Sequence, residues 1–266
     1  MNLSSYETLN VQSDGAIVRV HLNRPDVRNA FNKQMIADLT DVFGRLRKDK
    51  SVRAIVLGGE GSVFCAGADI KWMSDSIDGT EDENIADAKA MAYMYQTIDT
   101  CPVPVVGRVQ KAAFGGAIGL ISASDIVVAE TGTKLCFSEV RLGILPAVIS
   151  SFCMAKIGVS QARRYFITAE VFLAENAPAG LLHEVVPPDA LDRTVDSILE
   201  QILANGPRAV RETKKLIPQV AESTRAEAID LCARTIARVR VSEEGQAGLR
   251  AFLDKTDPPW QKKPGV

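Results

Sequence analysis

The sequence lacks several features on which common classes of enzyme depend. It has only two histidines in 266 residues. Neither His21 nor His183 lies beside the glycine-bearing turns at 61–70 and 112–120, so a histidine-activated nucleophile is disfavoured. No GxSxG, P-loop or GxGxxG motif occurs, which removes support for a serine hydrolase, a nucleotide-phosphate site and a dinucleotide-binding fold. His183 has no second histidine at helical zinc spacing, and the sequence predicts no metal site.

Cysteine pairs, long apolar runs and an excess of charge are also absent. The five cysteines are scattered and form no CxxC pair, which is typical of reduced, buried thiols. No run of about 18 apolar residues occurs, so no membrane span is predicted. A net charge of -2 gives no basic footprint for nucleic acid. Together with a start that lacks the pattern of a secretion signal, these features predict a cytoplasmic protein without nucleic-acid or membrane partners.

Two glycine-bearing turns are the most informative features that the sequence does contain. The first covers residues 61–70 and follows a β-branched run at 52–57; the second covers 112–120 and follows the run at 104–109. Each turn leads from a predicted strand into a helix-compatible stretch. Two such turns can bring two backbone N–H groups to one point, where they would stabilise an oxyanion. Small side chains there would allow a substrate carbonyl to approach the backbone.

The order of predicted elements indicates an α/β fold. A strand at 16–22 precedes an amphipathic helix at 33–48, and strands and helices then alternate to about residue 145. This alternation implies a largely parallel sheet with helices outside it. The acidic stretch at 74–84 is predicted to be a mobile surface segment, followed by a helix over 86–97.

The pattern changes to helices at about residue 189. Pro207, Pro218 and Gly245 are expected to punctuate this helical part. The predicted helices cover residues 190–204, 208–220, 224–239 and 242–253. The sequence therefore predicts a core over residues 1–189 and a C-terminal helical module over residues 190–266.

One carboxylate has the surroundings of a catalytic group. Glu139 lies in an apolar stretch soon after a predicted strand at 125–128. A carboxylate among apolar neighbours can have a raised pKa and exchange protons near neutrality. The alternative is an ordinary glutamate that pairs with Arg141 or with a backbone donor.

Ordered motifs along the chain resemble the crotonase (enoyl-CoA hydratase/isomerase) superfamily over essentially its whole length. The matching segments lie at residues 22–25 with 28–32, 64–70, 113–116, 124–125, 138–139 with 143, and 248–255 before 258–260. The resemblance implies an α/β fold with a crotonase-like ββα spiral core and a C-terminal α-helical trimerisation module. It also implies an acyl-CoA thioester substrate, so that CoA arrives as part of the substrate and no separate cofactor is expected.

The resemblance assigns roles to individual residues. The N–H groups of Ala68 and Gly116 match an oxyanion hole for the thioester carbonyl, and Glu139 matches a glutamate that transfers a proton at the α-carbon. The expected CoA-binding residues are Ala66, Asp69 and Ile70 near the adenine, Val27, Arg28 and Ala30 along the pantetheine and phosphates, and Phe252 and Lys255 from across a subunit interface. The implied assembly is a homotrimer or a hexamer built as a dimer of trimers.

One position departs from the pattern of the hydratases. Hydratases of this superfamily typically use two glutamates, and Glu139 matches the one that delivers a proton to the α-carbon. The other, which orients and deprotonates water, would lie three residues after Gly116, where this chain has Gly119. Two activities are therefore considered: hydration of an α,β-unsaturated acyl-CoA, and Δ3,Δ2-enoyl-CoA isomerisation, for which one glutamate suffices. A non-catalytic CoA- or RNA-binding homologue is the third possibility, which the retained Glu139 and the acidic net charge oppose.

Substrate specificity is the least determined part of the prediction. Residues 113–120 and 145–150 are similar to bacterial methylglutaconyl-CoA and related carboxylated-enoyl-CoA hydratases. Arg141 or Lys71 would then pair with a distal carboxylate of the substrate, or else each is a plain surface cation. Four large residues, Trp72, Met73, Met91 and Tyr95, lie either in the acyl pocket or in the ordinary core.

Overall fold

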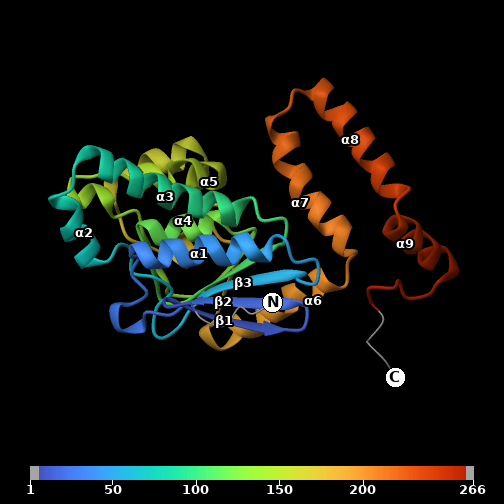
Figure 1. Cartoon of the computed structure of the whole chain (residues 1–266), viewed down its shortest axis with the longest axis horizontal. Coiled ribbons are helices and arrows are strands. Elements are labelled where there is room, and N and C mark those ends of the chain that lie inside the picture. Colours follow the sequence, from blue (N-terminus) through green and yellow to red (C-terminus); the bar gives the residue numbers. More distant parts are fainter. Residues whose placement is uncertain (1–5, 262–266) are drawn as a thin grey trace.

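The computed structural model describes residues 6–261, apart from the side chains of residues 75 and 76. Residues 1–5 of the predicted core and residues 262–266 of the predicted C-terminal module therefore lie outside the described residues. A six-stranded sheet forms the centre of the molecule (Figure 1). Its strands, in spatial order, are β1 (Leu9–Asp14), β2 (Ile17–Leu22), β3 (Ala54–Gly59), β4 (Val105–Val109), β6 (Ile126–Glu130) and β9 (Glu184–Val186).

The pairing in this sheet is parallel from β2 to β9, as the alternating pattern predicts. The exception is β1, which the sequence analysis did not anticipate and which pairs antiparallel with β2. Gly15 makes the tight turn between them with a φ of 58°. Every residue of β3 is buried, which is the pattern of a strand covered on both faces.

Alternate residues of β3 belong to two different cores. Ile55 and Leu57 face the large core beneath the helical layer, whereas Ala54 and Val56 face the opposite side. The helices of the layer are α1 (Lys33–Leu46), α3 (Glu81–Asp99), α4 (Gly116–Ala123) and α5 (Ala147–Thr168). The opposite side is covered by α6 (Leu191–Leu203), which packs against β3, β4 and β6.

A small second sheet supports the region where the second glycine turn lies. Its strands are β7 (Lys134–Cys136) in the middle, β5 (Ala112–Phe114) parallel to it and β8 (Phe172–Leu173) antiparallel. Short 3-10 helices complete the core: η1 (Pro25–Val27), η2 (Glu139–Leu142), η3 (Ala174–Asn176) and η4 (Pro188–Ala190). The sheet thus brings the start of α4 and the start of η2 to the same place.

Two helices cover most of the acidic stretch at 74–84, which lies on the surface as predicted. Helix α2 (Ile70–Ile77) covers its first part. Helix α3 then starts at Glu81, five residues before the predicted start, because Thr80 and Glu83 form a capping box. The acidic residues of this first turn also lie at the positive end of the helix dipole, where negative charge is stabilising.

Three helices form an arm that extends away from the core (Figure 1). They are α7 (Pro207–Glu222), α8 (Arg225–Arg240) and α9 (Glu243–Asp254), close to the predicted bounds. Pro218 and Gly245 lie inside α7 and α9 instead of ending them. The predicted module at 190–266 also includes α6, which the structure packs onto the main sheet. Within residues 6–261, no helix combines the length and apolar character needed to cross a bilayer.

Candidate active site

The first glycine turn leaves one backbone N–H group without a partner. Phe31 forms a bridge with Ala68, in which the N–H of Phe31 donates to the carbonyl of Gly67 at 2.8 Å. The N–H of Asp69 donates to the carbonyl of Phe31, also at 2.8 Å. Both neighbours of Ala68 are therefore bonded, while its own N–H group has no hydrogen-bond partner within residues 6–261.

Gly67 allows this turn to pass close to the second one. Its φ of 98° is strained for any residue with a Cβ atom. A Cβ atom there would also lie 3.0 Å from the carbonyl oxygen of Phe114, the last residue of β5. The glycine thus brings the two turns together, as the sequence predicts.

The second turn presents a helix N-terminus. Gly115 has a φ of 53° and a ψ of -124°, and its N–H donates to the carbonyl of Cys136 at 2.9 Å. Gly116 is the first residue of α4, a position whose N–H has no partner inside the helix. This N–H donates no hydrogen bond to any group among the described residues. The N–H of Gly116 is therefore available to an acceptor in the cavity.

Glu139 lies against this second turn at the start of η2. A Cβ atom on Gly115 would be 3.3 Å from its Oε1 atom, so the carboxylate rests on the glycine backbone. Its Oε2 atom is buried without a hydrogen-bond partner among the described residues. Burial raises the pKa of Glu139 above its usual value. The alternative pairing with Arg141 is not present, because Nη2 of Arg141 donates to the carbonyl of Ala169 at 2.5 Å.

These groups share one cavity of about 360 Å³, which opens between the turns, α2, α3 and the start of α5. Its lining includes Ala68, Gly116 and Glu139, the three residues predicted to be catalytic. The other lining residues are Ala66, Gly67, Trp72, Met73, Asn84, Asp87, Ala88, Met91, Gly115, Ser138, Leu142, Ile144, Leu145, Pro146, Ala147, Val148 and Ile149. Two free N–H donors beside a proton-transfer group of raised pKa fit chemistry at a carbonyl and its α-carbon.

The segments expected to bind CoA lie side by side at the edge of this cavity. The N–H of Ala66 donates to the carbonyl of Arg28 at 3.0 Å. Arg24 joins the two segments further, through an ion pair with Asp69 at 2.8 Å and a hydrogen bond to the carbonyl of Ala30 at 2.6 Å. The side chain of Asp69 also caps α2 by accepting from the N–H of Lys71. Asp69 is thus structural here, and a CoA contact would come from its backbone.

Val27 and Ile70 are exposed apolar residues on these two segments, with exposed fractions of 42% and 86%. Neither residue lines the cavity, so a ligand that covered them would have to extend beyond it. Arg28 adopts a left-handed conformation with a φ of 54° at the end of η1. The structure therefore assembles the expected CoA residues of the core, while their contacts with CoA stay predictions.

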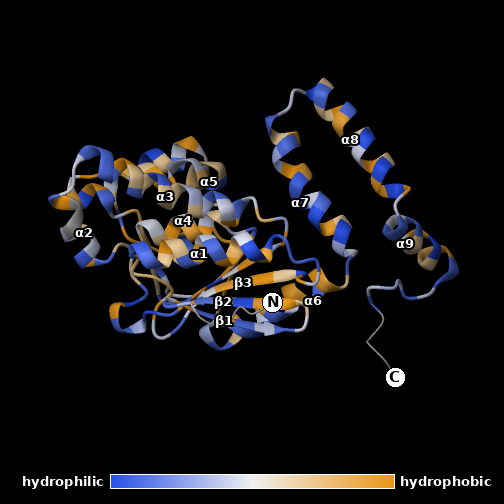
Figure 2. Cartoon of the chain, viewed as in Figure 1, coloured by the Kyte–Doolittle hydropathy of each residue, from blue (hydrophilic) through white to orange (hydrophobic). Residues whose placement is uncertain are grey.

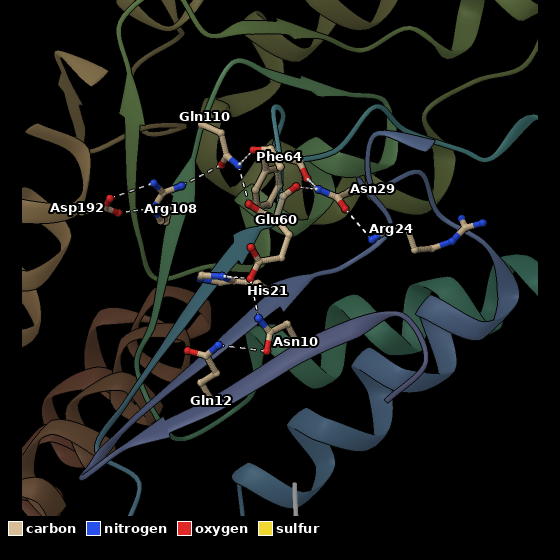
Figure 3. A network of polar contacts seen from close by, with 12 residues as sticks. Asn10, Gln12, His21, Arg24, Asn29, Glu60, Phe64, Arg108, Gln110 and Asp192 are labelled. Carbon is tan, nitrogen blue, oxygen red and sulfur yellow. Dashed lines mark hydrogen bonds and ion pairs between the residues drawn. The ribbon is translucent and has the colours of Figure 1, made fainter. Parts of the chain in front are cut away.

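Asn29 organises this region, and sequence reasoning gave it no role. It is fully buried, and its side-chain amide donates to the carbonyls of Glu60, Val63 and Phe64 at 2.8, 3.0 and 3.1 Å (Figure 3). Its Oδ1 atom accepts from the N–H of Arg24. One side chain therefore ties the segment at 24–30 to the loop that leads into the first glycine turn. Asn29 and Arg28 are both left-handed, with φ of 55° and 54°, and an asparagine in a turn after Pro25 was the only signal in the sequence.

The space for a second glutamate is already filled. A Cβ atom on Gly119 would lie 2.6 Å from Cγ2 of Ile149 and 2.7 Å from Cζ of Tyr95. Tyr95 is fully buried and does not line the cavity; its hydroxyl donates to the carbonyl of Gly116 at 2.7 Å. Gly119 is thus required by the packing of an aromatic ring against α4, which the sequence alone did not reveal.

Helices α2 and α3 build the other end of the cavity, which is the predicted acyl end. Of the four large residues left between pocket and core, Trp72, Met73 and Met91 line the cavity, whereas Tyr95 belongs to the core. Asp87, which the sequence analysis did not single out, accepts from Nε1 of Trp72 at 3.3 Å. The same Oδ2 atom forms an ion pair with Nζ of Lys33 at 2.9 Å. An acidic residue thus connects three helices at this end.

Phe252 and Lys255 lie on the arm, on the opposite side of the molecule from α2 and α3 (Figure 1). Phe252 is 81% exposed, and Lys255 ends α9 in a left-handed conformation. Neither residue lines the cavity of its own chain. Their predicted contact with CoA therefore requires another copy of the chain.

A family model for enoyl-CoA hydratase/isomerase matches residues 12–263. The chain belongs to this family. An enoyl-CoA hydratase of Alternaria alternata is 31% identical over 255 residues, which cover 94% of this chain and 81% of the relative. The crotonase superfamily prediction is confirmed, whereas the finer likeness to methylglutaconyl-CoA hydratases stays a prediction.

Solved structures of the family share the whole fold. An enoyl-CoA hydratase from Shewanella pealeana superposes with a TM-score of 0.92 at 36% identity, covering 96% of each chain. An enoyl-CoA hydratase/isomerase from Marinobacter aquaeolei gives 0.92 at 33% identity, covering 96% of this chain and all of the other. The predicted α/β fold of crotonase type is therefore confirmed, and the chain belongs to an enzyme family.

Proposed function

We propose that this enoyl-CoA hydratase/isomerase family member is a lyase that adds water to an α,β-unsaturated acyl-CoA. The observation that carries the proposal is the position of Glu139. Its carboxylate is buried, has one oxygen without a partner and shares a cavity with the free N–H groups of Ala68 and Gly116. CoA takes part as a portion of the substrate, and the proposed reaction uses no separate cofactor.

The proposed mechanism uses one carboxylate for both proton transfers. The thioester carbonyl accepts hydrogen bonds from Ala68 and Gly116, which stabilise the negative charge of the enolate. Glu139 takes a proton from water as the water oxygen bonds to C3, and the protonated carboxyl then delivers a proton to C2. One O–H bond of water and the C2–C3 π bond break, while a C3–O bond and a C2–H bond form. The raised pKa of Glu139 suits a group that must both accept and release a proton.

Isomerisation of a 3-enoyl-CoA is the second candidate, and Gly119 is the observation that favours it. Tyr95 and Ile149 fill the space beside this glycine, so no side chain at position 119 could hold a water molecule. In this reaction Glu139 removes a proton from C2, the N–H groups hold the dienolate, and Glu139 returns the proton to C4. No water is consumed, so a single carboxylate is sufficient.

One assay distinguishes these activities. The purified protein is incubated with crotonyl-CoA, 3-methylglutaconyl-CoA and a 3-enoyl-CoA, and the thioester absorbance and product masses are followed. Loss of conjugation with the gain of one water supports the hydratase. Gain of conjugation from the 3-enoyl substrate at constant mass supports the isomerase. Inactivity on all three overturns both and favours a non-catalytic CoA-binding protein; retarded RNA in a mobility-shift assay would favour an RNA-binding homologue.

The arm supports the further proposal of a homotrimer or a hexamer. Its helices carry exposed apolar residues between polar ones (Figure 2), among them Ile229, Val241, Phe252 and Leu253, with exposed fractions of 66%, 76%, 81% and 76%. Such a surface is typical of a region that packs against another chain. In this assembly Phe252 and Lys255 would contact CoA bound to a neighbouring copy.

We predict that Phe252→Asp shifts the protein toward smaller species, because a charge on an exposed apolar residue opposes packing against a partner. Light scattering coupled to gel filtration measures this change. Asp254→Asn, an exposed position on the same helix, is the control and should leave the mass unchanged. A mass equal to that of one chain for the unaltered protein would contradict the proposed assembly.

A further inference from the structure

The charged side chains that line the cavity are all acidic. Among the described lining residues, the ionisable ones are Asp87 at the acyl end and Glu139 at the catalytic end. The rest of the acyl wall is mainly apolar and includes Leu142, Ile144 and Leu145, which are more than half exposed at 59%, 56% and 69%. Exposed apolar residues that line a cavity gain burial when an apolar ligand covers them.

None of the described cations near this wall belongs to its lining, and Lys89, which follows Ala88 directly, is exposed outside it. Arg141 follows Glu139 by two residues, but its guanidinium donates to the carbonyl of Ala169 and is not part of the lining. Lys71 is exposed on α2 and is likewise outside the lining. Lys33 forms an ion pair with Asp87, whose carboxylate Trp72 also holds through its indole N–H. The charge of Lys33 is therefore compensated by the protein itself.

We propose that the acyl end of this site takes neutral, apolar acyl chains, and that Asp87 determines specificity against chains with a distal carboxylate. This proposal rests on the proposed function only in that the cavity binds acyl-CoA thioesters. A carboxylate on the acyl chain would lose water without gaining a cation from the lining, because Asp87 already holds the ammonium of Lys33 in its own ion pair. A neutral chain would meet neither cost. The substrate class therefore differs from the carboxylated one that local sequence similarity suggests.

Binding of two unreactive thioesters tests the proposal without relying on turnover. Hexanoyl-CoA is neutral and glutaryl-CoA carries a terminal carboxylate at a similar chain length. Isothermal titration calorimetry of the intact protein should give a dissociation constant at least about 10-fold lower for hexanoyl-CoA, because the shared CoA portion cancels in the ratio. Equal affinities, or tighter binding of glutaryl-CoA, would overturn the proposal.

Two variants locate the effect at this wall. Asp87→Asn keeps the shape of the side chain and removes its negative charge and its ion pair with Lys33, so the preference for hexanoyl-CoA should fall by about 10-fold. Ala88→Lys places a cation in the lining and should strengthen glutaryl-CoA binding by about 10-fold, a gain that a misfolded protein cannot produce. Asp82→Asn removes the same charge from the exposed first turn of α3, outside the lining, and is the control.

The outcomes separate this proposal from the proposed function. One outcome is that the protein converts no enoyl-CoA and still prefers hexanoyl-CoA in a way that depends on position 87. This result would overturn the hydratase and isomerase activities but support the proposed specificity for neutral acyl chains. Turnover of crotonyl-CoA with a ratio that Asp87→Asn does not change would support the activity and overturn the role of Asp87. Absence of binding by both thioesters would overturn both.

Discussion

The two ends of the cavity are built from different parts of the polypeptide. The catalytic end consists mostly of backbone: the N–H groups of Ala68 and Gly116, held by strand pairing and by the start of a helix, with the Glu139 carboxylate beside them. The acyl end consists of side chains from α2, α3 and the segment before α5. The fold determines the geometry of the catalytic end, whereas single substitutions at the acyl end can change which ligand the cavity prefers.

The largest effect is expected at the catalytic end, from Glu139→Gln. The change is nearly isosteric but removes proton transfer, and turnover of the proposed enoyl-CoA substrate should fall by about 10²–10⁴-fold. Binding of the saturated hexanoyl-CoA should change little. Steady-state kinetics together with calorimetry measure both quantities, and full activity in this variant would remove Glu139 from the mechanism.

The same variant should be more stable than the unaltered protein at neutral pH. Burial raises the pKa of Glu139 in the folded state, so the ionised carboxylate opposes folding. The penalty is absent below the pKa that Glu139 has in the unfolded chain, because both states are then protonated. It develops as the pH rises from that value through the raised pKa of the folded state. Thermal unfolding should therefore show a higher Tm for Glu139→Gln near pH 7 and equal values near pH 4, if Glu139 is buried as described.

A second carboxylate should not be tolerated beside the first. Gly119→Glu forces its side chain into Tyr95 and Ile149, and overpacking of this kind costs about 1–3 kcal/mol before the burial of charge is added. We expect a lower Tm and loss of turnover for every substrate. Gly119→Ala, with a Cβ atom alone, separates the steric part from the charge. Faster crotonyl-CoA hydration by Gly119→Glu would show that the ring of Tyr95 can move aside.

The smallest effect is expected from Tyr95→Phe, which alters the support beneath the catalytic end. Burial raises the pKa of Tyr95 well above its usual value, so the phenol stays protonated and donates to the carbonyl of Gly116. Loss of this hydrogen bond should lower the free energy of unfolding by about 1 kcal/mol. Chemical denaturation measures it. A fall in kcat at constant affinity for hexanoyl-CoA would show that the hydroxyl also positions the N-terminus of α4.

The catalytic end was largely predictable from the sequence, and the acyl end was not. Glycine turns after β-branched strands are local signals, and they predicted that the two turns meet. Ala68, Gly116 and Glu139, whose roles the family resemblance supplied, line one cavity. The parallel sheet and the helices of the arm follow from similarly local periodicity. The start of α3 was missed because a capping box outweighed the polar composition that suggested a mobile segment.

The remaining features depend on contacts between residues far apart in the chain. The steric role of Gly119 arises from Tyr95 on another helix, and no local pattern indicates it. Asp87 was overlooked because its neighbours Ala86 and Ala88 carry no motif, and only packing directs its side chain into the cavity. The redirection of Arg141 to Ala169 is equally a tertiary contact.

The bridge between Phe31 and Ala68 has a consequence for how this enzyme can vary. The N–H group of Ala68 is held by bonds to the backbone on either side of it, and the side chain at position 68 takes no part. Exchange of that side chain for another small one should be nearly silent in a selection for activity. Deletion of one residue between 65 and 69 would instead rotate a different amide into the cavity. The site therefore tolerates a substitution at position 68 but not a change in the length of this segment.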